Sequence, residues 1–189
     1  MIFSRVFRFL GALALVALLQ ACALPAGNFS PALDNVEALK KSGARSVSLG
    51  AFSVRAGMDG ANSIGLRGNP MSSPVGSDYA AYLADAIKQE LVLAGKWDPK
   101  SDLSISGTLL KNDIAAGGFS TNSGEIEARF VVMRGSERRY EATKRVEASW
   151  ESSFVGAVAI PKAQQQYPML VQKLLAQLYA DPAFQAALR

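Results

Sequence analysis

The chain is poor in the side chains that most enzymes use for catalysis. It contains no histidine and a single cysteine, Cys22, among its 189 residues. Without histidine, neither a Ser-His-Asp nor a Cys-His relay can form, and a metal site built from histidine and cysteine is also excluded. Only carboxylate, lysine or serine chemistry remains. We therefore expect a protein that is not an enzyme and that needs no metal and no cofactor.

Two carboxylates and one lysine are the strongest remaining candidates for catalysis. Glu125 and Glu127 share the solvent face of an expected strand, where Glu127 would lie opposite Arg145. A solvated charge ladder explains this arrangement better than a pair of catalytic carboxylates. Lys144 falls on the otherwise apolar face, where pairing with the small Ala128 near the end of the sheet would let its ammonium group reach water. A structural role for Lys144 is favoured over a functional one.

A glycine-rich segment, residues 57–71, has the composition of a phosphate-binding or partner-binding loop. It lacks the Gly-Lys-Ser/Thr ending of a phosphate loop, and it lies too far from the next helix for the amide groups there to contribute. We interpret it as a flexible surface loop. The more specific alternative is that it binds a partner. The apolar stretch 154–160 is a second candidate surface, although a core strand is the favoured interpretation. The candidate partner-binding residues are Met58, Ile64, Leu66, Arg67, Met71 and Phe154.

The N-terminus has the layout of an export signal. Arg5 and Arg8 precede an uninterrupted apolar run, residues 9–19, which is much shorter than the roughly 20 residues that a membrane-spanning helix needs. Removal of the expected signal, residues 1–21, lowers the number of basic residues from 20 to 18, against 16 acidic residues. The mature chain is therefore nearly neutral. Because it also lacks a cluster of basic and aromatic side chains, we expect no nucleic-acid partner.

The sequence Leu19-Gln20-Ala21-Cys22 resembles the lipobox of bacterial lipoproteins. This resemblance implies that the Cys22 thiol is diacylated, that the signal is cut before Cys22, and that the new amino group gains a third acyl chain. Gln20 departs from the small residue that is usual at its position. Two or three acyl chains hold a protein durably on a membrane, whereas one gives only marginal binding. Since Ala23, not aspartate, follows the cysteine, the resemblance favours the periplasmic face of the outer membrane over the inner membrane.

Periodic apolar positions predict the elements of the mature chain. Residues 22–43 contain two prolines, and we interpret them as the lipidated cysteine and a tether, with a short helical turn near residues 36–39. A single periplasmic domain then spans residues 44–189. Alternation with period two predicts strands, and steps of three and four predict helices. The expected strands cover residues 45–51, 102–114, 125–134 and 140–150, and the expected helices cover residues 78–91, 161–178 and 181–188.

The last two strands determine each other's register. Their apolar alternation places Phe130 opposite Ala142. A turn in which Arg134 pairs with Glu137 would shift this register by one residue, and such a shift moves every side chain to the other face of the sheet. We therefore predict a loop of three or five residues around Gly135, and no strictly two-residue turn.

The element order β-α-β-β-β-α predicts a two-layer α+β fold, in which two amphipathic helices pack on one face of a mixed four-stranded sheet. Together with the lipobox, this order resembles the periplasmic domains of small envelope lipoproteins. These include the YajG-type family, the lipopolysaccharide-assembly lipoprotein LptE and the auxiliary lipoproteins of lipid-transporting ABC systems. The resemblance covers most of the mature chain, and it implies a role in the cell envelope without selecting one.

Two functions from different classes remain open. The first is a non-catalytic, lipid-anchored accessory protein that binds a protein partner in outer-membrane assembly or transport. The second is a carrier or sensor that binds a lipid or another amphiphile between the helices and the sheet, which predicts a sizeable apolar cavity there. In both cases the membrane is an expected partner through the acyl chains on Cys22.

Overall fold

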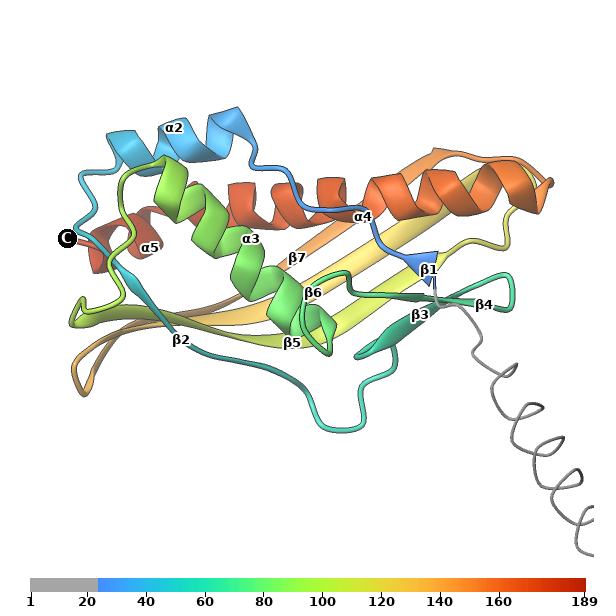
Figure 1. Cartoon of the computed structure of the whole chain (residues 1–189). Coiled ribbons are helices and arrows are strands. Elements are labelled where there is room, and N and C mark those ends of the chain that lie inside the picture. Colours follow the sequence, from blue (N-terminus) through green and yellow to red (C-terminus); the bar gives the residue numbers. More distant parts are fainter. Residues whose placement is uncertain (1–23) are drawn as a thin grey trace, which may run out of the picture.

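A computed structural model describes residues 24–189 of the chain, so the expected signal, the lipobox and Cys22 lie outside the described residues. Its main sheet has the strand order β2-β5-β6-β7 (Figure 1). The strands are β2 (Ser48–Val54), β5 (Leu103–Ala115), β6 (Thr121–Arg134) and β7 (Glu137–Glu151). β2 runs parallel to β5, and the other two pairs are antiparallel. The predicted mixed four-stranded sheet is confirmed.

Two long helices, α3 (Tyr79–Leu93) and α4 (Gly156–Tyr179), cover one face of this sheet, as predicted (Figure 1). Two shorter helices, α2 (Leu33–Lys41) and α5 (Pro182–Ala187), accompany them. Asp78 caps α3, because its side chain accepts a hydrogen bond of 2.8 Å from the amide of Ala81. α4 begins at Gly156, before its predicted start at Pro161, so the stretch 154–160 is not the core strand that we favoured.

In the described part of the chain, no helix combines the length and the apolar character needed to cross a bilayer.

Large side chains fill the layer between the helices and the sheet. Tyr79, Tyr82 and Tyr167 lie in one cluster, with ring centroids 4.7 to 6.4 Å apart. The Tyr79 hydroxyl donates to the carbonyl of Met71 at 2.9 Å, and that of Tyr82 donates to the carbonyl of Gly27 at 2.7 Å. Burial raises the pKa of all three tyrosines, so they stay neutral. The rings therefore fill the interior without leaving these hydroxyls unpaired.

Residues 24–41, which we predicted to belong to a tether, are packed onto the domain, and we call them the N-terminal strap. The strap contains β1 (Leu24–Pro25) and α2, and it buries Phe29, Val36 and Leu39. The tether prediction is therefore wrong for this segment. Its prolines and short apolar runs give no long periodicity. Contacts with α3 and α4 hold the strap in place, and these contacts cannot be recognised from the strap's own sequence.

A proline inside α4 provides one of the strap's attachment points. Pro168 has no N–H, so the carbonyl of Gln164 one turn earlier has no partner within the helix. The amide of Gly27 donates to that carbonyl at 3.0 Å. A Cβ atom at Gly27 would lie 2.9 Å from the same oxygen, so a side chain at this position would push the strap away from α4.

A buried carboxylate on α3 provides a second attachment point. Glu90 is fully buried, and its Oε1 atom accepts hydrogen bonds of 3.1 Å from the amide of Ala32 and from the side chain of Asn35. Burial raises the pKa of Glu90. A carboxylate in this position has to be hydrogen-bonded to be tolerated, and the strap supplies the donors.

The β6–β7 hairpin keeps the predicted register away from its turn, but the turn itself differs from our prediction. Arg134 pairs with Glu137, so Gly135 and Ser136 form a two-residue turn, in which Gly135 has a φ of +56°. Our prediction of a three- or five-residue loop is wrong because it took no account of a β-bulge. Arg139 is an extra, unpaired residue on β7 that absorbs the one-residue shift.

Residues 57–71, predicted as a flexible loop, contain most of a β-hairpin. Its strands are β3 (Ser63–Leu66) and β4 (Asn69–Ser72), and β4 also pairs in parallel with β1, which gives a second, three-stranded sheet. Arg67 and Gly68 form the turn with positive φ angles of 52° and 85°, as in the turns that join hairpins tightly. Strands of four residues show too little alternation to be recognised among glycines.

Candidate functional site

The structure separates the six candidate partner-binding residues into two groups. The side chains of Met58, Ile64, Leu66 and Met71 are buried, so they are not available to a partner. The apolar residues between the glycines of this segment therefore anchor the hairpin to the domain. The other two candidates, Arg67 and Phe154, lie together where the connection between β7 and α4 meets the β3–β4 turn.

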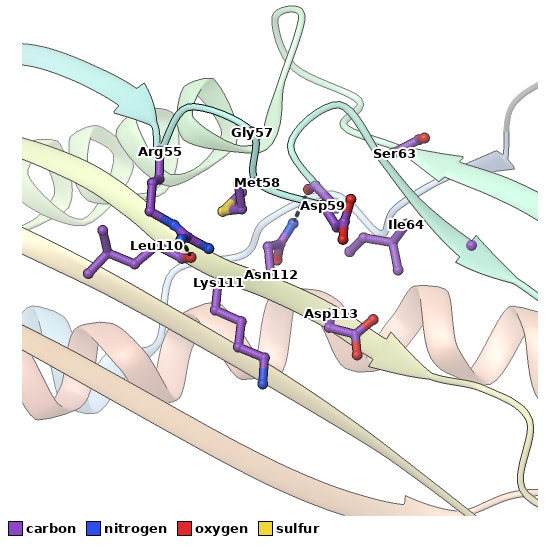
Figure 2. A pocket seen from close by; sticks show the side chains of 12 residues that line it. Arg55, Gly57, Met58, Asp59, Ser63, Ile64, Leu110, Lys111, Asn112 and Asp113 are labelled. Atoms are coloured by element: carbon purple, nitrogen blue, oxygen red, sulfur yellow. Dashed lines mark hydrogen bonds between the residues drawn. The ribbon is translucent and has the colours of Figure 1, made fainter.

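The loop before β3 lines a polar cleft of about 560 Å³ over β5 (Figure 2). Arg55 and Asp59 line it on the side of the loop, whereas the ammonium group of Lys111, another lining residue, contacts Glu125 on β6. Arg55 donates to the carbonyl of Leu110 at 3.3 Å. Among residues 24–189, no group of three or more acidic, histidine or cysteine side chains is placed to hold a metal ion. The cleft offers hydrogen bonds to a polar ligand without favouring one ligand class.

The acidic pair on the sheet belongs to a charge ladder, as predicted. Glu127 lies opposite Arg145 in the register, and Glu125 lies opposite Glu147. The Arg145 guanidinium is 2.7 Å from a carboxylate oxygen of Glu125 and also contacts Glu147. The hydrogen bond to Glu147 raises the pKa of Arg145. Glu125, Arg145 and Glu147 form an ion-pair network on the solvent face of the sheet.

Lys144 has a structural partner. It lies opposite Ala128, as predicted, and its ammonium group is 2.7 Å from the carboxylate of Asp181. The Tyr140 hydroxyl donates to the same carboxylate at 2.8 Å, and the other oxygen of Asp181 accepts from the amide of Ala183 in the first turn of α5. The hydrogen bond from Lys144 lowers the pKa of Asp181 to about 2. The pair therefore joins β7 to α5.

Two exposed aromatic rings stack at one end of the domain. Phe119, from the β5–β6 loop, and Phe154, from the β7–α4 connection, have ring centroids 5.1 Å apart and an interplanar angle of 9°. Their side chains are 76% and 68% exposed, and Val155 and Val158 are each more than half exposed. We call these four residues the apolar tip. The sequence analysis selected Phe154 by name and included Val155 and Val158 in the candidate stretch 154–160, but it missed Phe119.

Arg67 fixes the backbone beneath the apolar tip. Its guanidinium donates to the carbonyls of Ala116 (2.7 Å) and Gly118 (2.9 Å) in the β5–β6 loop. It also donates to the carbonyls of Ser153 (2.8 Å) and Phe154 in the β7–α4 connection. The donors of this side chain are thus used inside the protein, and Arg67 holds two separate segments together instead of offering itself to a partner.

The sequence does contain a signal for the apolar tip. No charged residue stands between Asp113 and Glu125, and none stands between Glu151 and Lys162. These two uncharged stretches meet in space where the Phe119 and Phe154 rings stack. A search for uncharged loops would therefore have found the tip, whereas a search for periodicity does not.

A second apolar surface lies between the strap and α3. It is a groove of about 360 Å³. The residues that line the groove are Pro31, Asp85, Lys88, Gln89, Val92 and Leu93. Val92 and Leu93 are more than half exposed, and so is Leu33 at the start of α2. We call this surface the α2–α3 groove.

No protein-family model matches the chain, and no curated protein matches it. Among solved structures, a DUF330-family protein from Xanthomonas campestris has 13% identity and a TM-score of 0.48, over 76% of this chain and 85% of its own. A candidate lipoprotein from Caulobacter crescentus CB15 has 11% identity and a TM-score of 0.46, over 82% and 96%. A hypothetical protein from Chlamydia trachomatis has 11% identity and a TM-score of 0.38, over 70% and 95%. Similarities this distant carry no argument about function.

Proposed function

We propose that the protein is a non-catalytic lipoprotein, anchored through Cys22 to the periplasmic face of the outer membrane, and that it binds a protein partner of the envelope. The lipobox-like sequence that ends at Cys22 supports the anchor. The observation that carries partner binding is the α2–α3 groove, where Val92 and Leu93 line the groove with exposed apolar side chains. Grouped apolar groups on a surface are typical of interaction sites.

The α2–α3 groove suits an amphipathic helix of the partner. Its lining is mainly apolar, and Asp85 and Lys88 provide one charge of each sign on α3. A helix that laid its apolar stripe over Val92 and Leu93 could direct its polar residues toward Asp85 and Lys88. Leu33 follows Ala32, whose amide is bonded to Glu90 on α3, so the same helix would be within reach of Leu33.

A carrier that holds a lipid between the helices and the sheet is supported less well. Tyr79, Tyr82 and Tyr167 occupy that layer, and Leu170 and Leu174 of α4 are at most 1% exposed. A ligand in this position would have to displace closely packed side chains. Native mass spectrometry of the purified protein distinguishes the two hypotheses, since only the carrier should retain a lipid that is not covalently attached.

The anchor is tested by the intact mass of the protein extracted from membranes. We expect a chain that begins at Cys22 and carries two or three acyl chains. The Cys22→Ser variant should lack the acyl chains and should leave the membrane fraction. A chain that begins elsewhere and has a free thiol would contradict the proposal.

Partner binding is tested by crosslinking in intact cells. A photoreactive residue at Val92 should crosslink to one envelope protein through a segment with helical apolar spacing. The same residue at Thr143, exposed on the solvent face of the sheet, is the matched control and should not give this product. Equal products from both positions, or none from Val92, would count against the groove as the binding site.

A further inference from the structure

The described chain begins close to the apolar tip. Leu24 of β1 lies opposite Met71 of β4, and the two strands are parallel. Followed backward, β1 therefore points toward the start of β4 and the turn at Arg67 and Gly68. Arg67 is itself bonded to the carbonyl of Phe154, beneath the tip. In Figure 1, the β5–β6 loop and the start of α4 lie at one end of the sheet, and β1 lies toward that same end.

The anchor that we propose at Cys22 is linked to this end by a short stretch of chain. One residue separates Cys22 from Leu24, so their Cα atoms are at most about 7 Å apart. The Gln164 side chain donates to the carbonyl of Pro25, which fixes the start of the strap on α4. Val158 of the tip lies on the same helix, about 9 Å from Gln164 along its axis. Acyl chains on Cys22 therefore bring a bilayer surface close to the tip.

The apolar tip has the chemistry of a surface that enters a membrane interface. It presents two stacked phenyl rings and two valines, and the two loops that carry it hold no charged residue. Apolar side chains gain free energy at the boundary of the acyl region, whereas charged ones lose their hydration there. Arg67 pairs four backbone carbonyls beneath the tip, so they would not be left without partners in lipid.

We propose that the apolar tip inserts into the lipid leaflet that holds the acyl chains of Cys22, so that the domain rests on the membrane in one orientation. This inference rests on the lipid anchor proposed above. The tip is a second, non-covalent membrane contact, and it keeps the charged β6–β7 turn at the far end of the sheet in water.

A fluorescent probe on the acylated protein tests this proposal. Because Cys22 is the only cysteine and is consumed by acylation, one introduced cysteine carries the only free thiol. The acylated protein is placed in vesicles of phosphatidylethanolamine and phosphatidylglycerol, with a nitrobenzoxadiazole label at Phe154→Cys. Leu93→Cys, also exposed and apolar, and Glu137→Cys at the far turn are the matched controls. We expect blue-shifted emission from position 154 and several-fold stronger quenching by lipids that carry a nitroxide near the headgroup.

Flotation of the same vesicles distinguishes failure of the tip insertion from failure of the lipid anchor. Protein that floats while position 154 is quenched no more than position 93 overturns the insertion and leaves the anchor standing. Protein that does not float overturns the anchor and the insertion together. A label at 154 that is shielded in native membranes but not in pure lipid vesicles means that a protein covers the tip, which also overturns the proposal.

A second variant tests the tip without a label on its rings. Phe119→Ser, combined with a labelled Val158→Cys, should reduce the lipid quenching at position 158 several-fold relative to Val158→Cys alone. An unchanged melting temperature shows that the fold is retained. Unchanged quenching in a folded variant would argue against insertion through the stacked rings.

Discussion

The two ends of the main sheet differ in charge. At the β6–β7 turn, Asp102 lies 3.3 Å from Arg45 and 3.7 Å from Arg134, and Glu137 lies 3.6 Å from Arg139. The opposite end, with the apolar tip, has no charged residue in either of its two loops. β5, β6 and β7 extend between the two ends, so the difference in charge lies in the side chains of the loops and not in the path of the strands. The difference indicates that one end is built to stay in water and the other to meet an apolar phase.

The largest difference in thermal stability is expected between two single-residue deletions in β7, at Arg139 and at Thr143. Deletion of Arg139 removes only the bulge residue, so the turn and the predicted register both survive. Deletion of Thr143 shifts one part of the hairpin by a residue and moves its core side chains to the solvent face. We expect a cooperative thermal transition near the original temperature for the first variant and none for the second.

Circular dichroism measures both transitions. Loss of the transition on deletion of Arg139 would show that the bulge is needed for folding, and our explanation of the turn would then be wrong.

Removal of the Arg67 side chain should give the next largest effect, at the uncharged end. Arg67→Ala leaves four backbone carbonyls without their charged donor. A hydrogen bond to a charged group has a net value of about 1.5–3 kcal/mol, but water can replace the donor at these partly exposed carbonyls, so the four values do not add. We expect a loss of about 2–3 kcal/mol in the free energy of unfolding, measured with urea. Hydrogen exchange should also become faster in residues 116–120 and 153–158.

The matched control is Arg138→Ala at the charged end, where the ion pair with Glu141 is exposed. Exposed pairs contribute little, so we expect a loss below about 0.5 kcal/mol. Equal losses at the two ends would contradict the role that we assign to Arg67.

The pair between Lys144 and Asp181 should give a smaller and pH-dependent effect. The folded state holds the pKa of Asp181 at about 2, below its ordinary value of 3.8, chiefly through the hydrogen bond from Lys144. The resulting stabilisation is therefore complete above about pH 4 and is lost as the pH falls toward 2. We expect Asp181→Asn to lose about 1–2 kcal/mol at pH 7, and the difference from the original protein should shrink between pH 4 and pH 2.

Denaturant unfolding at several pH values measures this difference. Lys144→Met is the control, because it removes the other half of the pair and should show a similar loss at pH 7. A difference that stays constant down to pH 2 would exclude Asp181 as the titrating group.

The elements that could be predicted from the sequence are those whose pattern is contained in their own residues. The three antiparallel strands and α3 each carry an apolar period, and Asp78 marks the start of α3. The strap could not be predicted in this way, because its position depends on partners far away in the sequence. Gly27 is bonded to Gln164 and Asn35 to Glu90, and neither pair forms a local pattern.

The candidate site was predicted less well than the fold. Met58, Ile64, Leu66 and Met71 were selected as apolar residues among glycines, but the same property lets a short hairpin bury them. Phe119 was missed because one aromatic residue in a loop of alanine, glycine and serine has no period. The informative property was the absence of charged residues in both the β5–β6 loop and the β7–α4 connection. These two loops form one apolar surface only in the folded protein, where they lie side by side.

Replacement of the stacked rings should have the smallest effect on stability, which makes it the sharpest test of the difference between the two ends. Phe119 and Phe154 are mostly exposed, so the folded state gains little beyond their mutual stacking, about 1 kcal/mol at most. We expect the Phe119→Ser and Phe154→Ser double variant to unfold at nearly the original urea concentration, whereas Leu174→Ser in the core should be strongly destabilised. A double variant that loses several kcal/mol would mean that the rings serve the fold, and the apolar end would then need no membrane to explain it.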